Sequence, residues 1–217
     1  MARWVRKQSM AVDVRTSRQL GVAIATGIHP VRIVVDAADD CDTELRCAAY
    51  VGVGRMIVGS SSQADFLAVC NEPRTQGVLV RTTDPAARSW PENDRDDTGT
   101  FGLPFATAST DRTVEAVLAH RRLSLQGLHC TVGWHHGGFF SSEAAIDHMV
   151  AELSRIRRRH DIVLTRLSLR REGPLLDSVV ELRTLAAQID GALDNACATM
   201  RFPRPRVLVS FAPLVNA

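Results

Sequence analysis

Histidine and cysteine side chains collect at the end of one apolar run, residues 125–134, which reads LQGLHCTVGW and precedes His135 and His136. Imidazole and thiolate groups are common zinc ligands, so His129, Cys130 and these two histidines are candidates for a metal site. Adjacent histidines at the end of a strand rarely both bind one ion, and no carboxylate lies close in the sequence. We therefore predict no metal site here. An exposed loop is the favoured interpretation of the two adjacent histidines, and a ligand pocket is the alternative.

Two basic residues could take part in catalysis. Arg81 ends the apolar run 77–81, and barrel enzymes carry their catalytic groups at the carboxyl ends of strands. A structural ion pair is the favoured role for Arg81, and catalysis together with His129 is the weaker alternative. Lys7 is the only lysine among the 26 Lys and Arg residues, and we expect it to be an exposed N-terminal side chain.

Composition excludes several classes of function. The 217 residues are 45% hydrophobic and 23% charged, as in an ordinary globular protein, and a net charge of +2 argues against nucleic-acid binding. The five cysteines follow no CxxC pattern, so neither a disulfide framework nor a zinc site is expected. The sequence shows no signal-peptide pattern and no run near the roughly 18 apolar residues of a membrane span. We therefore expect a cytoplasmic protein without a membrane partner.

Apolar strands alternate with amphipathic helices along the whole chain, which indicates parallel βαβ units. The predicted strands are residues 10–14, 31–35, 55–58, 77–81, 125–132, 162–169 and 206–211. The predicted helices begin at Ser17, Asp42 or Thr43, Ser61 or Ser62, Ser109 or Thr110, Ser142 and Leu176, with the serines and threonines as caps. Residues 82–100 and 134–140 are predicted loops. Because neither a GxGxxG motif nor a Walker loop is present, a barrel is favoured over a nucleotide-binding sheet.

Short motifs in a characteristic order run through most of the chain. They are Asp13-Val14 with Ser17 and Leu20, Gly27 through Val34, Arg81 with Asp84-Pro85, Phe101-Gly102-Leu103, Gly127 through Cys130 with Gly133, Leu167-Ser168-Leu169, and the C-terminal VLVS and LVNA. This order resembles the barrel domain of the pyridoxal-phosphate (PLP) decarboxylases acting on diaminopimelate, ornithine and arginine. These are fold type III enzymes with an alanine-racemase-like barrel, and the similarity is closest to the diaminopimelate branch, which serves lysine biosynthesis.

The resemblance implies a single α/β domain over residues 1–217, an incomplete (β/α)8 TIM barrel that holds strands two to eight. It also implies that the family's first strand and its C-terminal β-domain are absent. In the family, a lysine on the first strand forms the Schiff base with PLP. Lys7 lies only six residues before Asp13, too close to take that position.

The family's cofactor-binding motifs are also altered. A glycine-rich phosphate turn is replaced by Arg170-Arg171-Glu172, followed by Gly173-Pro174, and the Glu-Pro-Gly-Arg motif by Ser210-Phe211-Ala212-Pro213. The family histidine that stacks on the cofactor ring corresponds to Thr131, and the serine after the glycine to Trp134. The residues left to hold PLP or its phosphate are Gly133, Arg170, Arg171 and Gly173.

Three hypotheses follow. The favoured one is a degenerate decarboxylase homologue that is inactive by itself. The second is a non-catalytic module that pairs with a full-length decarboxylase, or with a second copy of itself, and regulates it. The third is an altered enzyme that uses Arg81, His129 and Arg170 on a phosphorylated ligand.

Overall fold

The computed structural model of the chain describes residues 11–37, 42–70, 74–83, 103–135, 138–171 and 179–211. These residues form two compact units. The first unit takes in the described residues up to Arg81, together with Leu103 and Thr107–Gln126. The second takes in Thr82, Thr83, Pro104–Ala106 and the described residues from Gly127 onward.

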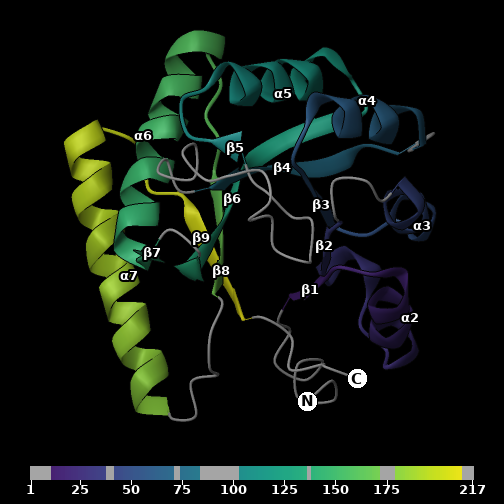
Figure 1. Cartoon of the computed structure of the whole chain (residues 1–217), viewed down its shortest axis with the longest axis horizontal. Coiled ribbons are helices and arrows are strands. Elements are labelled where there is room, and N and C mark those ends of the chain that lie inside the picture. Colours follow the sequence, from purple (N-terminus) through teal and green to yellow (C-terminus); the bar gives the residue numbers. More distant parts are fainter. Residues whose placement is uncertain are drawn as a thin grey trace. The chain divides into compact units, whose positions relative to one another are not determined.

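The first unit consists of strand–helix repeats, as the apolar pattern predicts (Figure 1). Its parallel strands follow chain order: β1 (Val12–Val14), β2 (Ile33–Asp36), β3 (Arg55–Val58) and β4 (Gln76–Thr83). Its helices are α2 (Ser17–Ala25), α3 (Asp42–Val51), α4 (Ser61–Cys70) and α5 (Ala108–Ala119). The two inner strands β2 and β3 bury nearly every residue, as expected of parallel strands packed on both faces.

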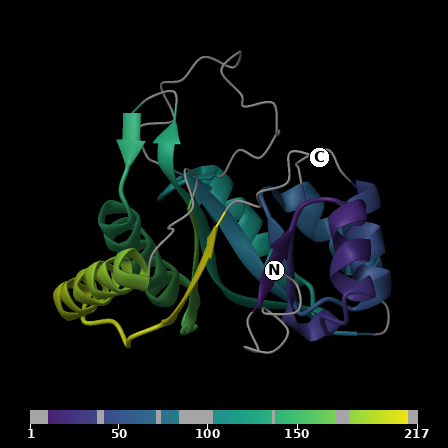
Figure 2. The same cartoon turned by 90° about the horizontal axis from the view of Figure 1, so that it is seen from below.

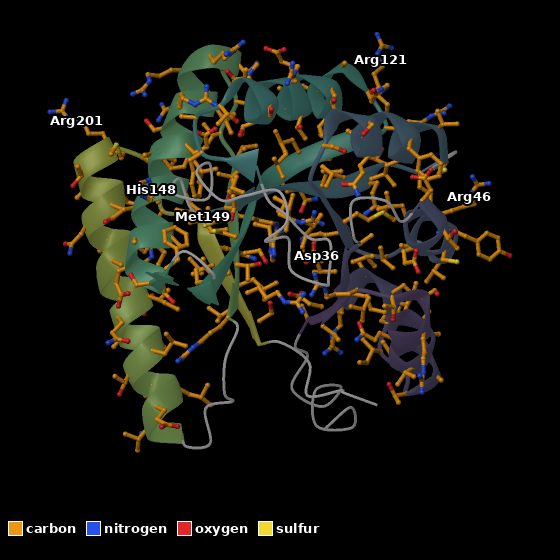
Figure 3. All side chains as sticks on the ribbon, viewed as in Figure 1. Asp36, Arg46, Arg121, His148, Met149 and Arg201 are labelled. Atoms are coloured by element: carbon orange, nitrogen blue, oxygen red, sulfur yellow. The ribbon has the colours of Figure 1, made fainter. Side chains whose placement is uncertain are left out.

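The second unit repeats the same arrangement. Strand β6 (Leu123–His135), which enters this unit at Gly127, pairs in parallel with β8 (Arg166–Arg171), and β8 pairs in parallel with β9 (Arg206–Phe211). Helices α6 (Ser142–His160) and α7 (Val179–Met200) lie along one side of these strands (Figure 2). Every third or fourth residue of α6 is buried, and Met149, labelled in Figure 3, belongs to this stripe.

Strands β4 and β6 each run through both units and are hydrogen-bonded neighbours in each. In the first unit the Gln76 backbone N–H donates to the Arg122 carbonyl oxygen at 2.8 Å. In the second, the Thr82 hydroxyl donates to the His129 carbonyl oxygen at 2.9 Å. Strand order is therefore β1-β2-β3-β4-β6-β8-β9, which follows the chain.

The helix caps differ from the prediction by one or two residues. Each hydroxyl that accepts a backbone N–H bond lies just before the helix and not within it, because a capping residue keeps extended backbone angles. The capping side chains are Thr16, Ser60, Thr107 and Ser141. The predicted caps are helical residues: Ser17, Ser61 or its alternative Ser62, Ser109 or its alternative Thr110, and Ser142. Because several hydroxyl residues adjoin one another at each helix start, the sequence did not indicate which of them caps the helix.

Three predicted boundaries are also wrong. Residues 31 and 32 belong to a 3-10 turn, Pro30–Arg32, because Pro30 fixes its own backbone and the His29 ring nitrogen accepts the Val31 N–H at 3.3 Å. Strand β8 begins at Arg166 and not at residue 162. The predicted loop 134–140 contains the end of β6 and the strand β7 (Gly138–Phe140), which pair as an antiparallel hairpin. A short strand β5 (Leu103–Pro104) completes the described elements.

Within the part of the chain that the structure describes, no helix is both long enough and apolar enough to cross a membrane.

Substitution of Gly127 tests the close approach of two strands. A Cβ atom at Gly127 would overlap the carbonyl group of Arg166 on β8, and backbone cannot move aside as a flexible side chain can. We expect Gly127→Ala to lower the free energy of unfolding by about 1–3 kcal/mol, measured by denaturant titration. The control is Gly191→Ala in helix α7, where a Cβ meets no atom within 4 Å; it should be neutral or stabilise by up to about 1 kcal/mol. Equal losses of unfolding free energy in both variants would contradict the close approach of Gly127 to the Arg166 backbone.

Candidate functional site

The strands of the second unit carry most of their polar side chains on one face, and Arg171 lies on the other. Parallel register pairs His129 with Ser168 and Ser168 with Leu208, and two residues further on it pairs Thr131 with Arg170 and Arg170 with Ser210. Side chains paired in this way point to the same side of a parallel sheet, and residues two apart share a face. The intervening positions are the apolar residues Leu128, Cys130, Val132, Leu167 and Leu169, all 3% exposed or less. The sheet therefore has one apolar face and one polar face.

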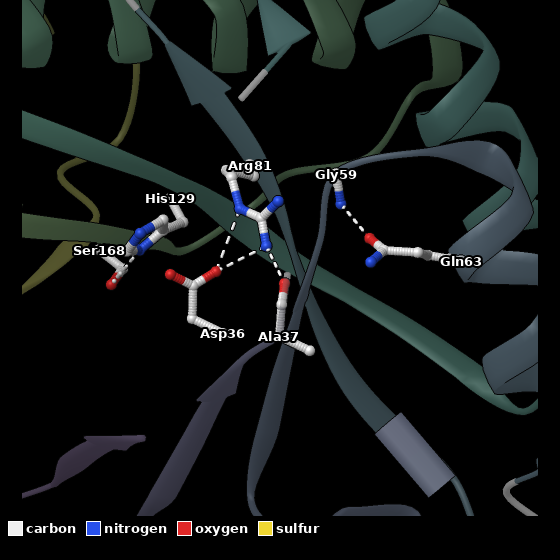
Figure 4. A network of polar contacts seen from close by, with 7 residues as sticks. All are labelled: Asp36, Ala37, Gly59, Gln63, Arg81, His129 and Ser168. Atoms are coloured by element: carbon white, nitrogen blue, oxygen red, sulfur yellow. Dashed lines mark hydrogen bonds and ion pairs between the residues drawn. The ribbon is translucent and has the colours of Figure 1, made fainter. Parts of the chain in front are cut away.

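The first polar row contains a buried histidine–serine pair. The His129 ring nitrogen Nδ1 lies 3.0 Å from the Ser168 hydroxyl oxygen, and the two residues are 0% and 1% exposed (Figure 4). This hydrogen bond offsets part of the cost of burying both groups. It also fixes the orientation of the imidazole. The catalytic role considered for His129 remains a prediction.

The second polar row contains a buried arginine. Arg170 is 3% exposed, whereas Arg171, which alternates to the other face of β8, is half-buried. A guanidinium keeps its charge at all accessible pH, so its burial costs several kcal/mol unless anions or hydrogen-bond acceptors surround it. Beside it, the Ser210 hydroxyl oxygen is buried and has no hydrogen-bond partner among the described residues.

Gly133 lies on β6 beyond this row, on the same face as Thr131. It is buried and has a φ of +133°, a backbone conformation that L side chains rarely adopt. Its pairing with Phe140 leads directly into the hairpin. Glycine is therefore required here by backbone geometry, whatever else it does in binding.

Arg81 forms a buried ion pair in the first unit. Its Nε and Nη2 atoms donate to Asp36 Oδ1 at 3.1 and 2.7 Å, and Nη2 also donates to the Ala37 carbonyl oxygen at 2.5 Å (Figure 4). Both Arg81 and Asp36 are 2% exposed. These contacts favour the structural role over a catalytic one.

A glycine lies beside this ion pair on the intervening strand. Asp36 ends β2 and Arg81 lies on β4, so the guanidinium must reach across the intervening strand β3. Continuing the register of Val58 with Val80 places Gly59, which has no side chain, beside Arg81. The Gly59 backbone N–H is itself held by Gln63 Oε1 at 2.7 Å. The sequence analysis missed Asp36, although its position at the end of an apolar strand was a usable signal.

The described residues do not fit PLP in the form that the resemblance implies. They include no lysine that could form a Schiff base. Arg170, which the resemblance assigns to the glycine-rich phosphate turn, is a large buried side chain within β8, where backbone N–H groups would have to approach a phosphate. Ser210, which the resemblance assigns to the family's glutamate, offers a neutral hydroxyl and not a carboxylate. The predictions on Lys7, Gly173, His136 and most of loop 82–100 lie outside the described residues.

Other reactive groups are dispersed. Within the described residues, no three His, Cys, Asp or Glu side chains are placed to hold a metal ion. Cys130 is buried on the apolar face of β6, and burial raises the pKa of the Cys197 thiol.

The strand order and the parallel strand–helix repeats define a class of protein, the α/β barrels. The family described as "Pyridoxal-dependent decarboxylase, pyridoxal binding domain" matches residues 1–169, and the chain belongs to this family. This confirms the resemblance identified from the sequence.

Among curated relatives, the chain is 31% identical to diaminopimelate decarboxylase of Mycobacterium tuberculosis (strain ATCC 25618 / H37Rv) over 137 residues, 61% of this chain and 31% of the relative. It is 27% identical to diaminopimelate decarboxylase of Mycobacterium leprae over 222 residues, 96% of this chain and 47% of the relative. The chain thus spans about half the length of the curated relatives that match nearly all of it.

Solved structures show the same fold. Diaminopimelate decarboxylase from M. jannaschi superposes with a TM-score of 0.75 at 15% identity, covering 97% of this chain and 50% of that one. Lysine/ornithine decarboxylase from Vibrio vulnificus, complexed with putrescine, gives 0.68 at 15% identity, with 97% and 52% covered. The predicted fold class, an incomplete TIM barrel of the PLP-decarboxylase type, is confirmed.

Removing the guanidinium of Arg81 tests its structural role. Arg81→Met leaves the Asp36 carboxylate buried without this partner, so we expect the free energy of unfolding to fall by about 3–5 kcal/mol. The matched control is Arg204→Met, whose ion pair with Asp190 at 2.6 Å is exposed, and which should change stability by less than about 1 kcal/mol. Denaturant titration of both variants checks the difference. A similar small loss of unfolding free energy in both variants would show that the buried ion pair stabilises the protein no more than the exposed one does.

Proposed function

We propose that this chain is a degenerate relative of the diaminopimelate, ornithine and arginine decarboxylases that does not catalyse decarboxylation by itself. The observation that carries the proposal is the chemistry of the polar face on β6, β8 and β9: its described side chains include no lysine, and Arg170 is buried where the resemblance implies a glycine-rich turn. The names of the curated relatives supply the substrate class, and diaminopimelate is the first compound to test.

The chemical reason lies in how these enzymes activate an amino acid. Loss of CO2 leaves electrons on the α-carbon, and PLP joined to the substrate amine would accept them best while its ring nitrogen stays protonated. A serine hydroxyl at position 210 cannot supply the negative charge that would hold this proton. In the family a lysine holds the cofactor until the substrate amine replaces it, and Lys7 is the one lysine side chain of the sequence.

Titration with PLP tests this proposal directly. We expect no Schiff-base absorbance band in the folded chain, and after borohydride reduction no pyridoxyl group in the peptide that contains Lys7. Circular dichroism establishes that the chain is folded, and Lys7→Arg serves as the matched control without an amine. A saturable band in the wild-type chain that Lys7→Arg abolishes would refute the loss of the cofactor site.

Turnover is a separate test. Purified chain with PLP should release no more CO2 from diaminopimelate, ornithine or arginine than PLP alone. Release above that background, lost on boiling, would contradict the proposed inactivity whatever the absorbance shows.

A second candidate function is pairing with a full-length decarboxylase, or with a second copy of this chain. Two apolar residues in the first turn of helix α7 favour it, because Val180 is 71% and Leu182 is 43% exposed. Light scattering and co-purification with a co-expressed decarboxylase would test it, with Leu182→Glu as the disrupting variant.

A cytoplasmic location belongs to the same proposal and is supported by the free thiols of Cys47 and Cys70.

Catalysis on a phosphorylated ligand by Arg81, His129 and Arg170 is the weakest alternative. Arg81 is bonded to Asp36, and His129 to Ser168, so both side chains are engaged within their own units. Arg170, the third residue of this hypothesis, is buried in β8.

A further inference from the structure

A cavity of about 350 Å³ lies at the carboxyl ends of helices α4 and α5 and is open to solvent. The residues that line it are Ala68, Val69, Ala119, His120, Arg121 and Arg122. All of them belong to the first unit, in which α4 and α5 pack against each other. The volume is at the lower end of the range of roughly 300–1,000 Å³ that is typical of ligand pockets. The cavity therefore suits a small ligand.

The turn between α5 and β6 holds the basic residues of this cavity in place. The His120 backbone N–H donates to the Val117 carbonyl oxygen at 3.4 Å, and the Leu123 N–H donates to the His120 carbonyl oxygen at 2.9 Å. The Arg122 carbonyl oxygen accepts the Gln76 N–H from β4 at 2.8 Å. The backbone of the turn is thus fixed before any ligand arrives, which lowers the entropic cost of binding.

The position of this turn distinguishes the cavity from the polar face described above. The turn leads into the amino end of β6, whereas barrel enzymes carry their catalytic groups at the carboxyl ends of the strands. None of the residues that line the cavity belongs to the polar face of β6, β8 and β9. A ligand in this cavity is therefore independent of the cofactor and of decarboxylation.

One wall of the cavity is apolar. It consists of Ala68 and Val69 on α4 and Ala119 at the end of α5. Val69 is 75% exposed, so most of its side chain meets water that a bound apolar group would displace. Positive charge beyond the end of α5 also suits the helix dipole, but the dipole does not require an apolar wall beside it.

The opposite wall is basic. Arg121 makes no hydrogen bond or ion pair with any residue that the structure describes, and Figure 3 shows its side chain extending into solvent at the end of α5. The nearby carboxylate of Asp65 is paired with His120, whose Nε2 atom lies 2.8 Å from Asp65 Oδ1. The charge of Arg121 therefore favours an anion at the mouth of the cavity.

We propose that this cavity binds a small carboxylic acid that has an apolar chain. The chain lies against Ala68, Val69 and Ala119, and the carboxylate meets the guanidinium of Arg121. Such a ligand satisfies both walls at once, because an inorganic anion leaves the apolar wall uncovered and a neutral apolar molecule leaves the charge unpaired. Binding is non-covalent and needs no other group.

Calorimetric titration with hexanoate tests the proposal. Acetate has the carboxylate without the chain, and hexylammonium has the chain with the opposite charge, so these two compounds are the controls. We expect saturable binding of hexanoate with a Kd of about 1 mM or tighter, and at least about tenfold weaker binding of both controls. In amide NMR spectra, the signals of Val69, Ala119 and Arg121 should shift with the same Kd. Absence of saturable binding, or equal affinity for hexanoate and acetate, would overturn the proposal.

Charge reversal separates Arg121 from the general charge of the chain. Arg121→Glu should weaken hexanoate binding at least about fivefold and strengthen hexylammonium binding, because a carboxylate then stands at the mouth of the cavity. The matched control is Arg112→Glu, the same change at an exposed arginine of α5 outside the cavity, and it should leave both affinities unchanged. Equal effects of the two charge reversals would refute the site.

A second variant tests the apolar wall. Val69→Ser changes an exposed helix position without altering charge, and it should weaken hexanoate binding at least about twofold because the chain loses an apolar contact. Circular dichroism establishes that each variant is folded. An unchanged hexanoate Kd in Val69→Ser would show that the chain does not lie in this cavity.

Discussion

The pairing of parallel strands is the constraint on which the rest of this structure depends. Once β6, β8 and β9 are in register, every second side chain faces the same way, and residues far apart in the chain stand in rows. The side chains of Leu128, Cys130 and Val132 therefore lie on the apolar face. The polar residues between them are brought together on the other face, which is why a site can exist there at all.

Register also separates the residues that the fold requires from the polar residues. Arg170 fits its strand because the side chain alternates onto a face that already carries polar groups. The apolar face, which supplies most of the free energy of folding, is formed by the residues between them. The core and the polar groups thus occupy opposite faces of the same three strands.

The two buried arginines illustrate different outcomes of burying a charge. Arg81 reaches Asp36 across a strand that has Gly59 beside it, and the resulting pair is enclosed within the first unit. Such a pair secures local geometry more than it adds net stability, because desolvation offsets much of the attraction. Arg170 instead lies on β8 between Thr131 of β6 and Ser210 of β9 in the strand register, near the carboxyl end of the strands.

The sequence by itself determined the alternation of strands and helices, the seven parallel strands and the family, because these depend on local apolar periodicity and on the order of short motifs. It left the helix caps ambiguous where hydroxyl residues adjoin, and it missed the β7 hairpin, whose short strand is stabilised only by pairing with β6. Tertiary structure alone decided that Arg81 meets Asp36, 45 residues away, and that Arg170 is buried while Arg171 is not. Those outcomes depend on which strands lie side by side and in what register, and no local pattern encodes that.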